Sequence, residues 1–417
     1  MENFKSKSIP GVLVLEDKAH PEGIAFDGFL FGAEAGASAI LGAQKSGGIT
    51  RDRGYGEVVF NTSLTGYQEI LTDPSYYGQI ICMTVPHIGN TGVNRDDPES
   101  AHPWCAGFVV HEISDAASNW RADSGNRGEL DAYLKENGIP GLYGMDTRAL
   151  TRHIRTSGAL RGVILPASER AKAKELLASL PKFEGRDLIG EVTTKEAYKW
   201  PHPKAVAQKV TKIGERETPP YNEGKKNQKR HKVVVLDFGT KWNLLRSLDA
   251  LGCDLEVLPA NSTSKDILAR EPDGVFLTNG PGDPAAAPYA ANTVRELIGK
   301  VPMFGVCMGH QILSLAKGAK TYKMKFGHRG GNQPVLEISS GRVEITSQNH
   351  GYAVDEKTLP SDMKVTHIHL NDRTVSGVEV TGAQAFSVQY HPESCPGPHD
   401  SRILFDRFIA MMNQASK

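Results

Sequence analysis

The feature that most restricts the fold of this chain is a regular alternation of two kinds of segment after residue 232. Short apolar, β-branched runs are separated by segments whose apolar residues follow helical spacing. The runs are VVVLDFG, DLEVLPA, GVFLTNG and VPMFGVC, and helices are expected in TKWNLLRSLDALG and near residues 265–270 and 293–300. This alternation is typical of an α/β domain with a mainly parallel central sheet flanked by helices.

The chain has 417 residues, more than one compact core usually holds, so two domains are expected. Residues 193–231 are polar, contain prolines and lack periodicity, which indicates a linker. We therefore expect an N-terminal domain in residues 1–192 and the α/β domain in residues 232–417. In the first half, the β-like runs GVLVLED and EVVFNTS, with helices near residues 130–137 and 148–157, predict a smaller α/β domain.

Charge and cysteine usage exclude several classes of protein. Lys+Arg and Asp+Glu both total 48, so no net charge attracts nucleic acid or an anionic membrane, and the basic run KKNQKRHK is interpreted as solvated linker. No run of about 18 apolar residues predicts a membrane span. The five dispersed cysteines form no C-x-x-C pair and the N-terminus lacks a signal-peptide core, so we expect a cytoplasmic protein without disulfides.

The sequence FGVCMGHQIL places Cys307 between Gly305 and Gly309, where a predicted strand passes into a helix. G-x-C-x-G is the thiol counterpart of the G-x-S-x-G nucleophile elbow, in which glycines permit a sharp turn. The helix N-terminus favours the thiolate, and the backbone N–H of Met308 would point at a developing oxyanion. A buried, unreactive cysteine is the alternative, and this motif alone leaves both open.

A candidate base follows a second predicted strand, in AFSVQYHPES, where Glu393 comes two residues after His391. Because the carboxyl ends of parallel strands meet at one edge of a sheet, both residues are expected near Cys307. The imidazole would take and return the thiol proton, and the carboxylate would orient it. The loop TNGPGDP, residues 278–284, also follows a strand and offers backbone N–H groups for an oxyanion hole if it faces Cys307.

The other histidines and glycine-rich segments give weaker signals. His367 and His369 share a strand face in THIHL, but no third ligand has convincing spacing, so we expect an ordinary strand and no metal site. His310 and Gln311 are expected to pack or to contact substrate. The segment FGHRGGNQP does not open a helix after a strand, and no phosphate loop or dinucleotide fingerprint is present. The sequence therefore indicates thiol chemistry rather than nucleotide chemistry.

Together, GVCMGHQ, QYHPE and NGPGDP resemble the class I glutamine amidotransferases. The first half resembles the small subunits of carbamoyl phosphate synthetases, most specifically over residues 56–94 and in DTRALTRHIR. KFGHRGGNQPV and SQNHGYAVD add to this resemblance, which covers nearly the whole chain. Residues 31–53 depart from it as an apparent insertion, and we assign them no role.

The resemblance implies a mechanism and a set of site residues. Cys307 would attack the side-chain amide of glutamine to form a glutamyl thioester, with His391 as general acid and base and Glu393 orienting it. Backbone N–H groups of Met308 and Gly280 would hold the oxyanion. The implied glutamine-binding residues are Ser75, Gly280, Gly282, Met308, Gln311, Asn349, Gly351 and Tyr352. Related chains often carry Phe at the last of these positions.

The resemblance also implies a partner, the large subunit of carbamoyl phosphate synthetase, to which ammonia passes through a tunnel. ATP and magnesium would belong to that subunit, and this chain would need no cofactor of its own. A heterodimer is implied, while an assembly of several heterodimers and the choice between arginine and pyrimidine synthesis stay open. The alternatives are an amidotransferase subunit of another synthase, a non-catalytic scaffold, and a free-standing cysteine hydrolase.

Overall fold

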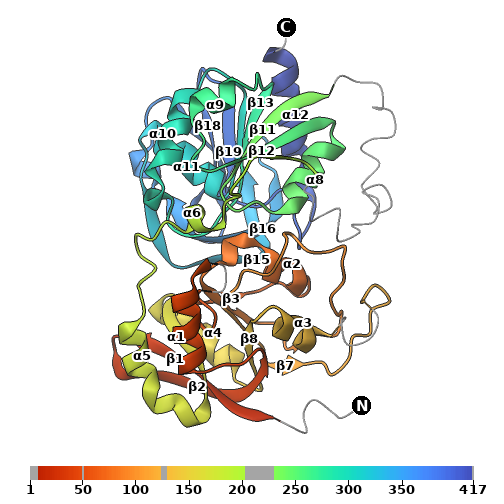
Figure 1. Cartoon of the computed structure of the whole chain (residues 1–417). Coiled ribbons are helices and arrows are strands. Elements are labelled where there is room, and N and C mark those ends of the chain that lie inside the picture. The colour runs from red at the N-terminus through yellow and green to blue at the C-terminus, as the bar shows by residue number, and fades with distance from the viewer. Residues whose placement is uncertain (1–7, 49–50, 124–128, 202–229, 416–417) are drawn as a thin grey trace. The chain divides into compact units, whose positions relative to one another are not determined.

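The computed structural model describes residues 8–48, 51–123, 129–201 and 230–415, which form two compact units (Figure 1). Unit 1 comprises Met1–Thr72, Tyr76–Pro98 and His102–Glu184. Unit 2 comprises Asp73–Ser75, Glu99–Ala101 and Gly185–Lys417. Two short segments of the N-terminal half thus belong to the C-terminal unit, an exchange that the sequence pattern does not reveal.

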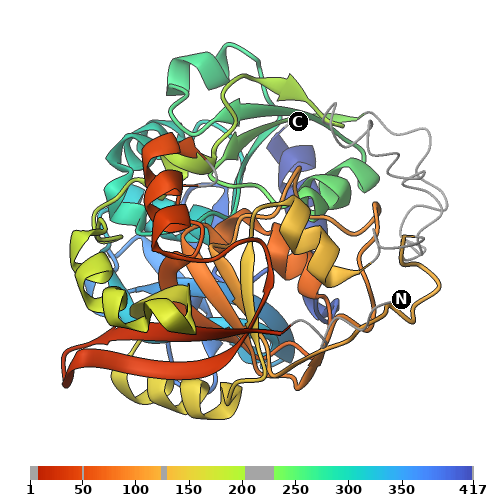
Figure 2. The same cartoon turned by 60° about the horizontal axis from the view of Figure 1, so that its bottom comes forward.

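Unit 1 is built around a closed barrel with the strand order β1-β2-β8-β6-β4-β3-β9. Its strands are β1 (Ile9–Asp17), β2 (His20–Gly32), β3 (Tyr55–Asn61), β4 (Gln79–Met83), β6 (Gly107–Val109), β8 (Pro140–Tyr143) and β9 (Leu160–Pro166). The hairpin of β1 and β2 is the long paired ribbon in Figure 2. Strands β3, β4, β6 and β8 pair in parallel, so long crossover connections join them. A two-stranded sheet of β5 (His87–Ile88) and β7 (Glu112–Ile113) completes the unit.

The helices of unit 1 pack their apolar stripes on this barrel. They are α1 (Ala37–Ser46), α2 (Tyr67–Thr72), α3 (Leu130–Glu136), α4 (Thr147–Ser157) and α5 (Ala173–Ser179). Helix α4 starts at Asp146, whose carboxylate accepts a hydrogen bond from the backbone N–H of Ala149, and it buries Leu150 and Ile154. Helices α3 and α4 confirm the two helices predicted in this half, and β1 and β3 confirm the predicted strands. Helix α1 occupies the apparent insertion.

Unit 2 contains a 10-stranded sheet with the order β10-β12-β11-β13-β14-β19-β18-β17-β15-β16. The parallel centre consists of β12 (Cys253–Pro259), β11 (His231–Asp237), β13 (Gly274–Leu277), β14 (Met303–Val306) and β19 (Ala385–Val388). The antiparallel strands are β10 (Tyr198–Lys199), β18 (Val375–Val380), β17 (Met363–His369), β15 (Thr321–Glu337) and β16 (Val343–Val354). The short apolar runs are the parallel strands, because burial on both faces removes any need for alternation.

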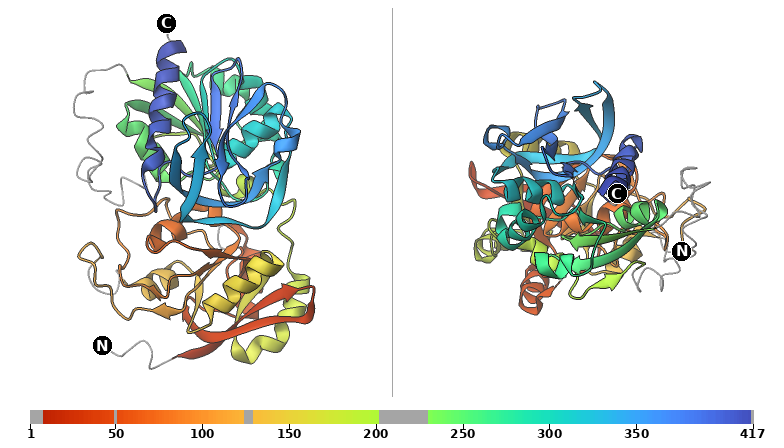
Figure 3. Two further views of the ribbon diagram at one scale, coloured as in Figure 1. Left: turned by 180° about the vertical axis from the view of Figure 1, so that it is seen from behind. Right: turned by 90° about the horizontal axis from the view of Figure 1, so that it is seen from above.

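Helices cover both faces of this sheet, as Figures 1 and 3 show. Their bounds are α6 (Leu188–Val192), α8 (Trp242–Ala250), α9 (Ser264–Leu268), α10 (Pro288–Leu297), α11 (Met308–Lys317) and α12 (Ile403–Ala415). On one face, Phe405 and Phe408 of α12 contact the rings of Phe276 and Phe304, and α8 packs in the same core. On the other face, α9, α10 and α11 form a second core. The predicted α/β fold class is confirmed.

The boundary between the units lies earlier than the sequence suggested. Unit 2 begins at Gly185, and both α6 and β10 belong to it, although they fall in or beside the predicted linker. The remainder of that linker, residues 202–229 with most of the basic run, lies outside the described residues. Within the described part of the chain, no helix is long and apolar enough to cross a membrane. All five cysteines are free thiols, as expected.

Candidate active site

Cys307 stands on the predicted elbow, between the end of β14 and the start of α11, all within unit 2. Its backbone has φ 53° and ψ −99°, a conformation that a side chain with a Cβ adopts only under constraint. A Cβ on Gly309 would overlap the carbonyl oxygen of Leu277, and one on Gly305 would crowd Gly309. The N–H of Cys307 donates to the carbonyl of Val388 at 2.9 Å. Close packing of α11 against β13 therefore holds the strained nucleophile turn that the sequence predicted.

The thiol is buried and lies near β16, which carries the predicted Asn349, and near the residue that follows β19. The Sγ atom of Cys307 lies 3.5 Å from the carbonyl oxygen of Asn349 and 3.7 Å from the side-chain nitrogen of Gln389. Met308 is the first residue of α11, where backbone N–H groups have no acceptor within the helix. Gly309 donates its N–H to the carbonyl of Thr278 and His310 donates to that of Cys307, so Met308 is the residue of this turn that can offer its N–H to an oxyanion beside the thiol.

His391 and Glu393 are fully buried and paired directly. The Nδ1–H of His391 donates to Glu393 Oε1 at 2.8 Å. Burial alone would lower the pKa of His391, but the charge of Glu393 and a contact with the Cys307 thiol raise it well above its ordinary value. Because Glu393 fixes Nδ1 as a donor, Nε2 is the nitrogen left for proton exchange with the thiol. The predicted nucleophile, base and orienting carboxylate are brought together.

Lys241 is a member of the site that sequence reasoning missed. It precedes α8 and is almost fully buried, with Nζ 2.8 Å from Glu393 Oε1, the same oxygen that accepts from His391. Burial would raise the pKa of Glu393, yet the charges of Lys241 and His391 hold it well below its usual range. Burial would likewise lower the pKa of Lys241, and Glu393 raises it instead. Glu393 therefore stays ionised between two cationic donors.

A buried hydrogen-bond network connects Lys241 to the predicted glutamine-binding residues. The backbone N–H of Lys241 donates to Asn279, and Asn279 donates to Ser75 Oγ at 2.8 Å and to Asp73 at 3.2 Å. Asn349 donates to the other carboxylate oxygen of Asp73 at 3.3 Å. The carboxylate of Asp73 also accepts from the backbone of Ser75 at 2.9 Å. Asp73 and Asn279 are polar residues in loops, and only the fold places them beside the site.

The remaining residues predicted to bind glutamine lie on α11, on β16 and in the loop after β13. Gln311 donates to the backbone carbonyl of Tyr352 at 2.8 Å, which links the catalytic helix to β16. A Cβ at Gly280 would overlap the carbonyl of Phe238, and Gly282 has φ 85°, so both positions require glycine. Gly351 and Tyr352 follow Asn349 along β16. Whether these residues contact glutamine stays a prediction.

Two further histidines considered in the sequence, His310 and His367, pack against neighbouring side chains. His310 is fully buried and its Nδ1 lies 2.9 Å from Ser387 Oγ, on the adjoining strand β19. Burial lowers the pKa of His310 to about 3, so the ring is neutral. His367 lies edge-on to the ring of Tyr390 and 2.9 Å from Thr366 Oγ1. Neither joins the catalytic group.

Comparisons with known proteins agree with this geometry. Residues 234–411 match the family model Glutamine amidotransferase class-I. Unit 2 is accordingly a class I glutamine amidotransferase domain. Residues 22–164 match the model Carbamoyl-phosphate synthase small chain, CPSase domain.

Curated relatives cover both units together. A carbamoyl phosphate synthase small chain of Syntrophotalea carbinolica is 51% identical over 364 residues, 86% of this chain and 92% of the relative. A chloroplastic one of Oryza sativa subsp. japonica is 51% identical over 358 residues, 86% of this chain and 77% of the relative. One of Chlorobaculum tepidum is 44% identical over 412 residues, 98% and 99% of the two chains. The chain belongs to the carbamoyl phosphate synthase small-chain family, which confirms the resemblance.

Proposed function

We propose that this chain is the glutamine-hydrolysing subunit of a carbamoyl phosphate synthase and works through a thioester on Cys307. The observation that carries the proposal is the position of Cys307 on a strained elbow, electrostatically coupled to a His391 that is fixed by Glu393 and Lys241. Membership of the small-chain family supplies the substrate class.

In the first half of the reaction, the thiolate sulfur of Cys307 bonds to the amide carbon of the glutamine side chain. The C=O electron pair moves to oxygen, and the N–H groups of Met308 and Gly280 stabilise this oxyanion. The protonated Nε2 of His391 then gives its proton to the departing nitrogen as the C–N bond breaks. The products are ammonia and a glutamyl thioester.

In the second half, neutral His391 removes a proton from a water molecule, whose oxygen attacks the thioester carbonyl. The C–S bond breaks, glutamate is released, and the thiolate–imidazolium pair returns. Glu393 holds the ring in one tautomer in both halves, and Lys241 keeps Glu393 ionised. Ser75, Asn279 and Asn349 are positioned by Asp73 to line the substrate side of the site.

The ammonia serves a large subunit, which supplies the sites for ATP, magnesium and bicarbonate, while this chain needs no cofactor for its own step. Confinement of ammonia between the two subunits keeps it from being protonated and lost to solvent. We place the protein in the cytoplasm, because five free cysteines fit a reducing compartment. The names of two curated plant relatives carry the word chloroplastic, so a chloroplast is the alternative location.

The test is to mix the purified chain with a carbamoyl phosphate synthase large subunit, ATP and bicarbonate. Carbamoyl phosphate formation is measured from glutamine and from ammonia, with and without the chain. We expect only the glutamine-driven reaction to depend on the chain and on Cys307. Carbamoyl phosphate formed from ammonia but not from glutamine would contradict the proposal. An equal rate of glutamine hydrolysis without the large subunit would favour a free-standing hydrolase.

A further inference from the structure

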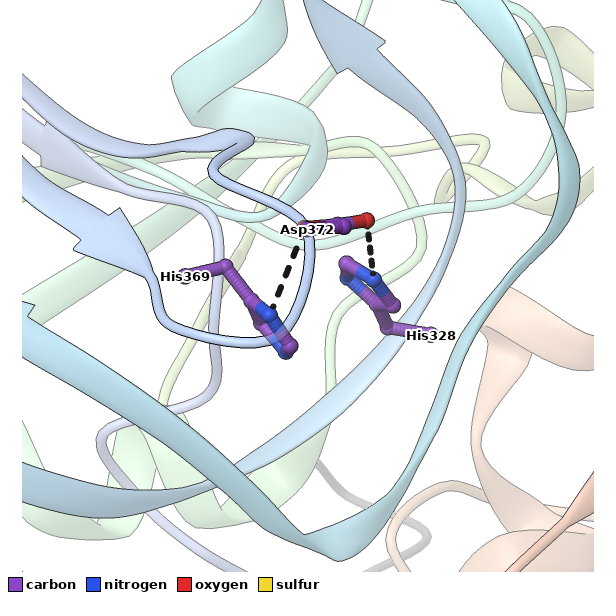
Figure 4. Close-up of side chains that lie close together, drawn as sticks. All are labelled: His328, His369 and Asp372. Carbon is purple, nitrogen blue, oxygen red and sulfur yellow. Dashed lines mark hydrogen bonds and ion pairs between the residues drawn. The ribbon is translucent and has the colours of Figure 1, made fainter.

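Apart from the catalytic group, unit 2 contains a second cluster of histidine and carboxylate side chains. His328 of β15, His369 at the end of β17 and Asp372 in the following turn converge there (Figure 4). Asp372 Oδ2 lies 2.9 Å from His328 Nε2, and Asp372 Oδ1 lies 3.4 Å from His369 Nδ1. The two imidazole rings stack at 4.0 Å. In the sequence, His367 and His369 lack a third ligand with suitable spacing; the fold brings His328 and Asp372 to His369 instead.

Each ring has a hydrogen-bonding partner on the side away from Asp372. His350 Nδ1 lies 2.7 Å from the carbonyl oxygen of Tyr352, and its Nε2 lies 2.9 Å from Gln348 Oε1 and 3.3 Å from His328 Nδ1. His328 is therefore held through its Nδ1, and its Nε2 is the nitrogen that faces Asp372.

His369 is held in a similar way. Its Nε2 lies 3.1 Å from the side-chain oxygen of Gln333 and donates to it. Its Nδ1 accepts a long hydrogen bond, 3.2 Å, from the backbone N–H of Asn371. One ring nitrogen of each histidine thus faces an oxygen of the same carboxylate. A carboxylate between two imidazole nitrogens stabilises a positive charge there, either a proton on a ring or a metal ion.

Outer hydrogen bonds hold all three candidate ligands, as they do in metal sites. His350 orients His328, Gln333 orients His369, and the hydroxyl of Thr374 donates to Asp372 Oδ1 at 2.9 Å. The ligand atoms lie within 4.8 Å of one another. Bonds of about 2.0–2.2 Å place two ligands of one zinc ion up to roughly 4 Å apart, so a small side-chain rotation closes the site. The half-exposed Asp372 leaves room for a water ligand.

We propose that His328, His369 and Asp372 form a binding site for one divalent transition-metal ion of the zinc type, with water as the fourth ligand. Two imidazoles and one carboxylate are a donor set that suits zinc and its neighbours rather than magnesium or calcium. The ion would join β15 to the turn that links β17 and β18. Through His328 and His350 it would also adjoin β16, the strand that carries Asn349.

The experiment titrates the full-length chain with Co²⁺ and follows both the visible absorption of bound cobalt and the amount bound at equilibrium. The protein carries Cys307→Ser, so that the catalytic thiol cannot act as a ligand. We expect one equivalent of cobalt with a nitrogen and oxygen spectrum, displaced by Zn²⁺. Asp372→Asn and His369→Asn should each abolish stoichiometric binding. Gln333→Ala, which removes an outer partner, should weaken it by roughly 10–100-fold.

The matched control is His367→Asn, because His367 lies two residues from His369 on β17 and outside the cluster; it should bind one equivalent. Circular dichroism of each variant reports folding, and the half-exposed Asp372 makes Asp372→Asn the variant best suited to fold normally. Absence of cobalt binding by the folded parent protein would overturn the proposal and leave a proton shared in the cluster. Equal binding by folded Asp372→Asn would also overturn it, because the ion would then bind elsewhere.

Discussion

Unit 2 holds two histidine–carboxylate clusters that use the same side chains differently. At Glu393, both neighbours are donors, the Nζ of Lys241 and the Nδ1–H of His391. At Asp372, both neighbours are imidazole nitrogens, and the carboxylate is half-exposed. The first arrangement stabilises a charged imidazole, and the second offers three ligand atoms to a cation. The buried lysine beside Glu393, more than residue type, therefore separates the catalytic base from the candidate metal ligands.

The largest effect is expected at the nucleophile. Cys307→Ser should lower glutamine-dependent carbamoyl phosphate synthesis by roughly 10⁴-fold or more, because serine at this site lacks a thiolate. Synthesis from ammonia by the same complex should be unchanged. A matched control is Cys253→Ala on β12, which removes another buried thiol and should leave both rates intact. Substantial glutamine use by the serine variant would remove Cys307 from the mechanism.

Removal of the orienting charge should have the next largest effect. Glu393→Gln should lower kcat by about 10²–10⁴-fold, since an amide does not stabilise the imidazolium or fix its tautomer as a carboxylate does. The charge of Glu393 raises the pKa of His391, so its loss lowers that pKa. The alkaline limb of the kcat–pH profile, where His391 loses its proton, should therefore move to lower pH. If the alkaline limb stays at the same pH, it does not report the titration of His391.

Lys241 provides the opposite test of the same cluster. Its charge lowers the pKa of His391, so Lys241→Met should move the alkaline limb to higher pH. The variant also leaves Glu393 with one cationic partner in a buried site, which should lower the free energy of unfolding by about 3–5 kcal/mol. Urea denaturation and the pH profile measure the two effects. A shift in the same direction as that of Glu393→Gln would contradict the assigned charges.

For the second cluster, the most direct test is the change in the free energy of unfolding when metal binds. At a free cobalt concentration 100 times the dissociation constant, the chain carrying Cys307→Ser should gain about 2.7 kcal/mol of unfolding free energy. Adding Asp372→Asn should remove this gain, whereas adding Glu393→Gln should keep it. If the gain instead depended on Glu393, the roles of the two clusters would be reversed.

The smallest effect is expected in the network around Asp73. Ser75→Ala removes one acceptor from Asn279, whose side chain also donates to Asp73. A loss of about 1 kcal/mol should raise the KM for glutamine roughly five- to tenfold with little change in kcat. Steady-state kinetics distinguish this from a loss of kcat, which would place Ser75 in the chemical step.

The sequence predicted those parts of the site that lie within single strand-to-loop segments. Cys307 and the pair of His391 and Glu393 each follow an apolar strand, and parallel pairing brings such strand ends to one edge. The parallel strands and their helices were recognisable for the same reason, since burial on both faces gives continuous apolar runs.

Other parts depend on contacts between segments far apart in the sequence. Lys241 reaches Glu393 across 152 positions, and Asn349 reaches Asp73 across 276. No local pattern marks a lysine that precedes a helix as buried, or assigns residues 73–75 to the C-terminal unit. His328 and His369 likewise meet only because β15 and β17 pair in register. Spacing rules for metal ligands assume nearby residues and miss such a pair.

The central claim is the thioester on Cys307, and it can be observed directly. The chain in complex with its large subunit is mixed with glutamine and quenched in acid during steady-state turnover. After digestion, the mass of the peptide that contains Cys307 is measured by mass spectrometry. The account predicts that this peptide gains the mass of a glutamyl group, and that the gain is absent in Cys307→Ala. An unmodified Cys307 peptide during active glutamine turnover, together with an acyl group on another residue, would contradict it.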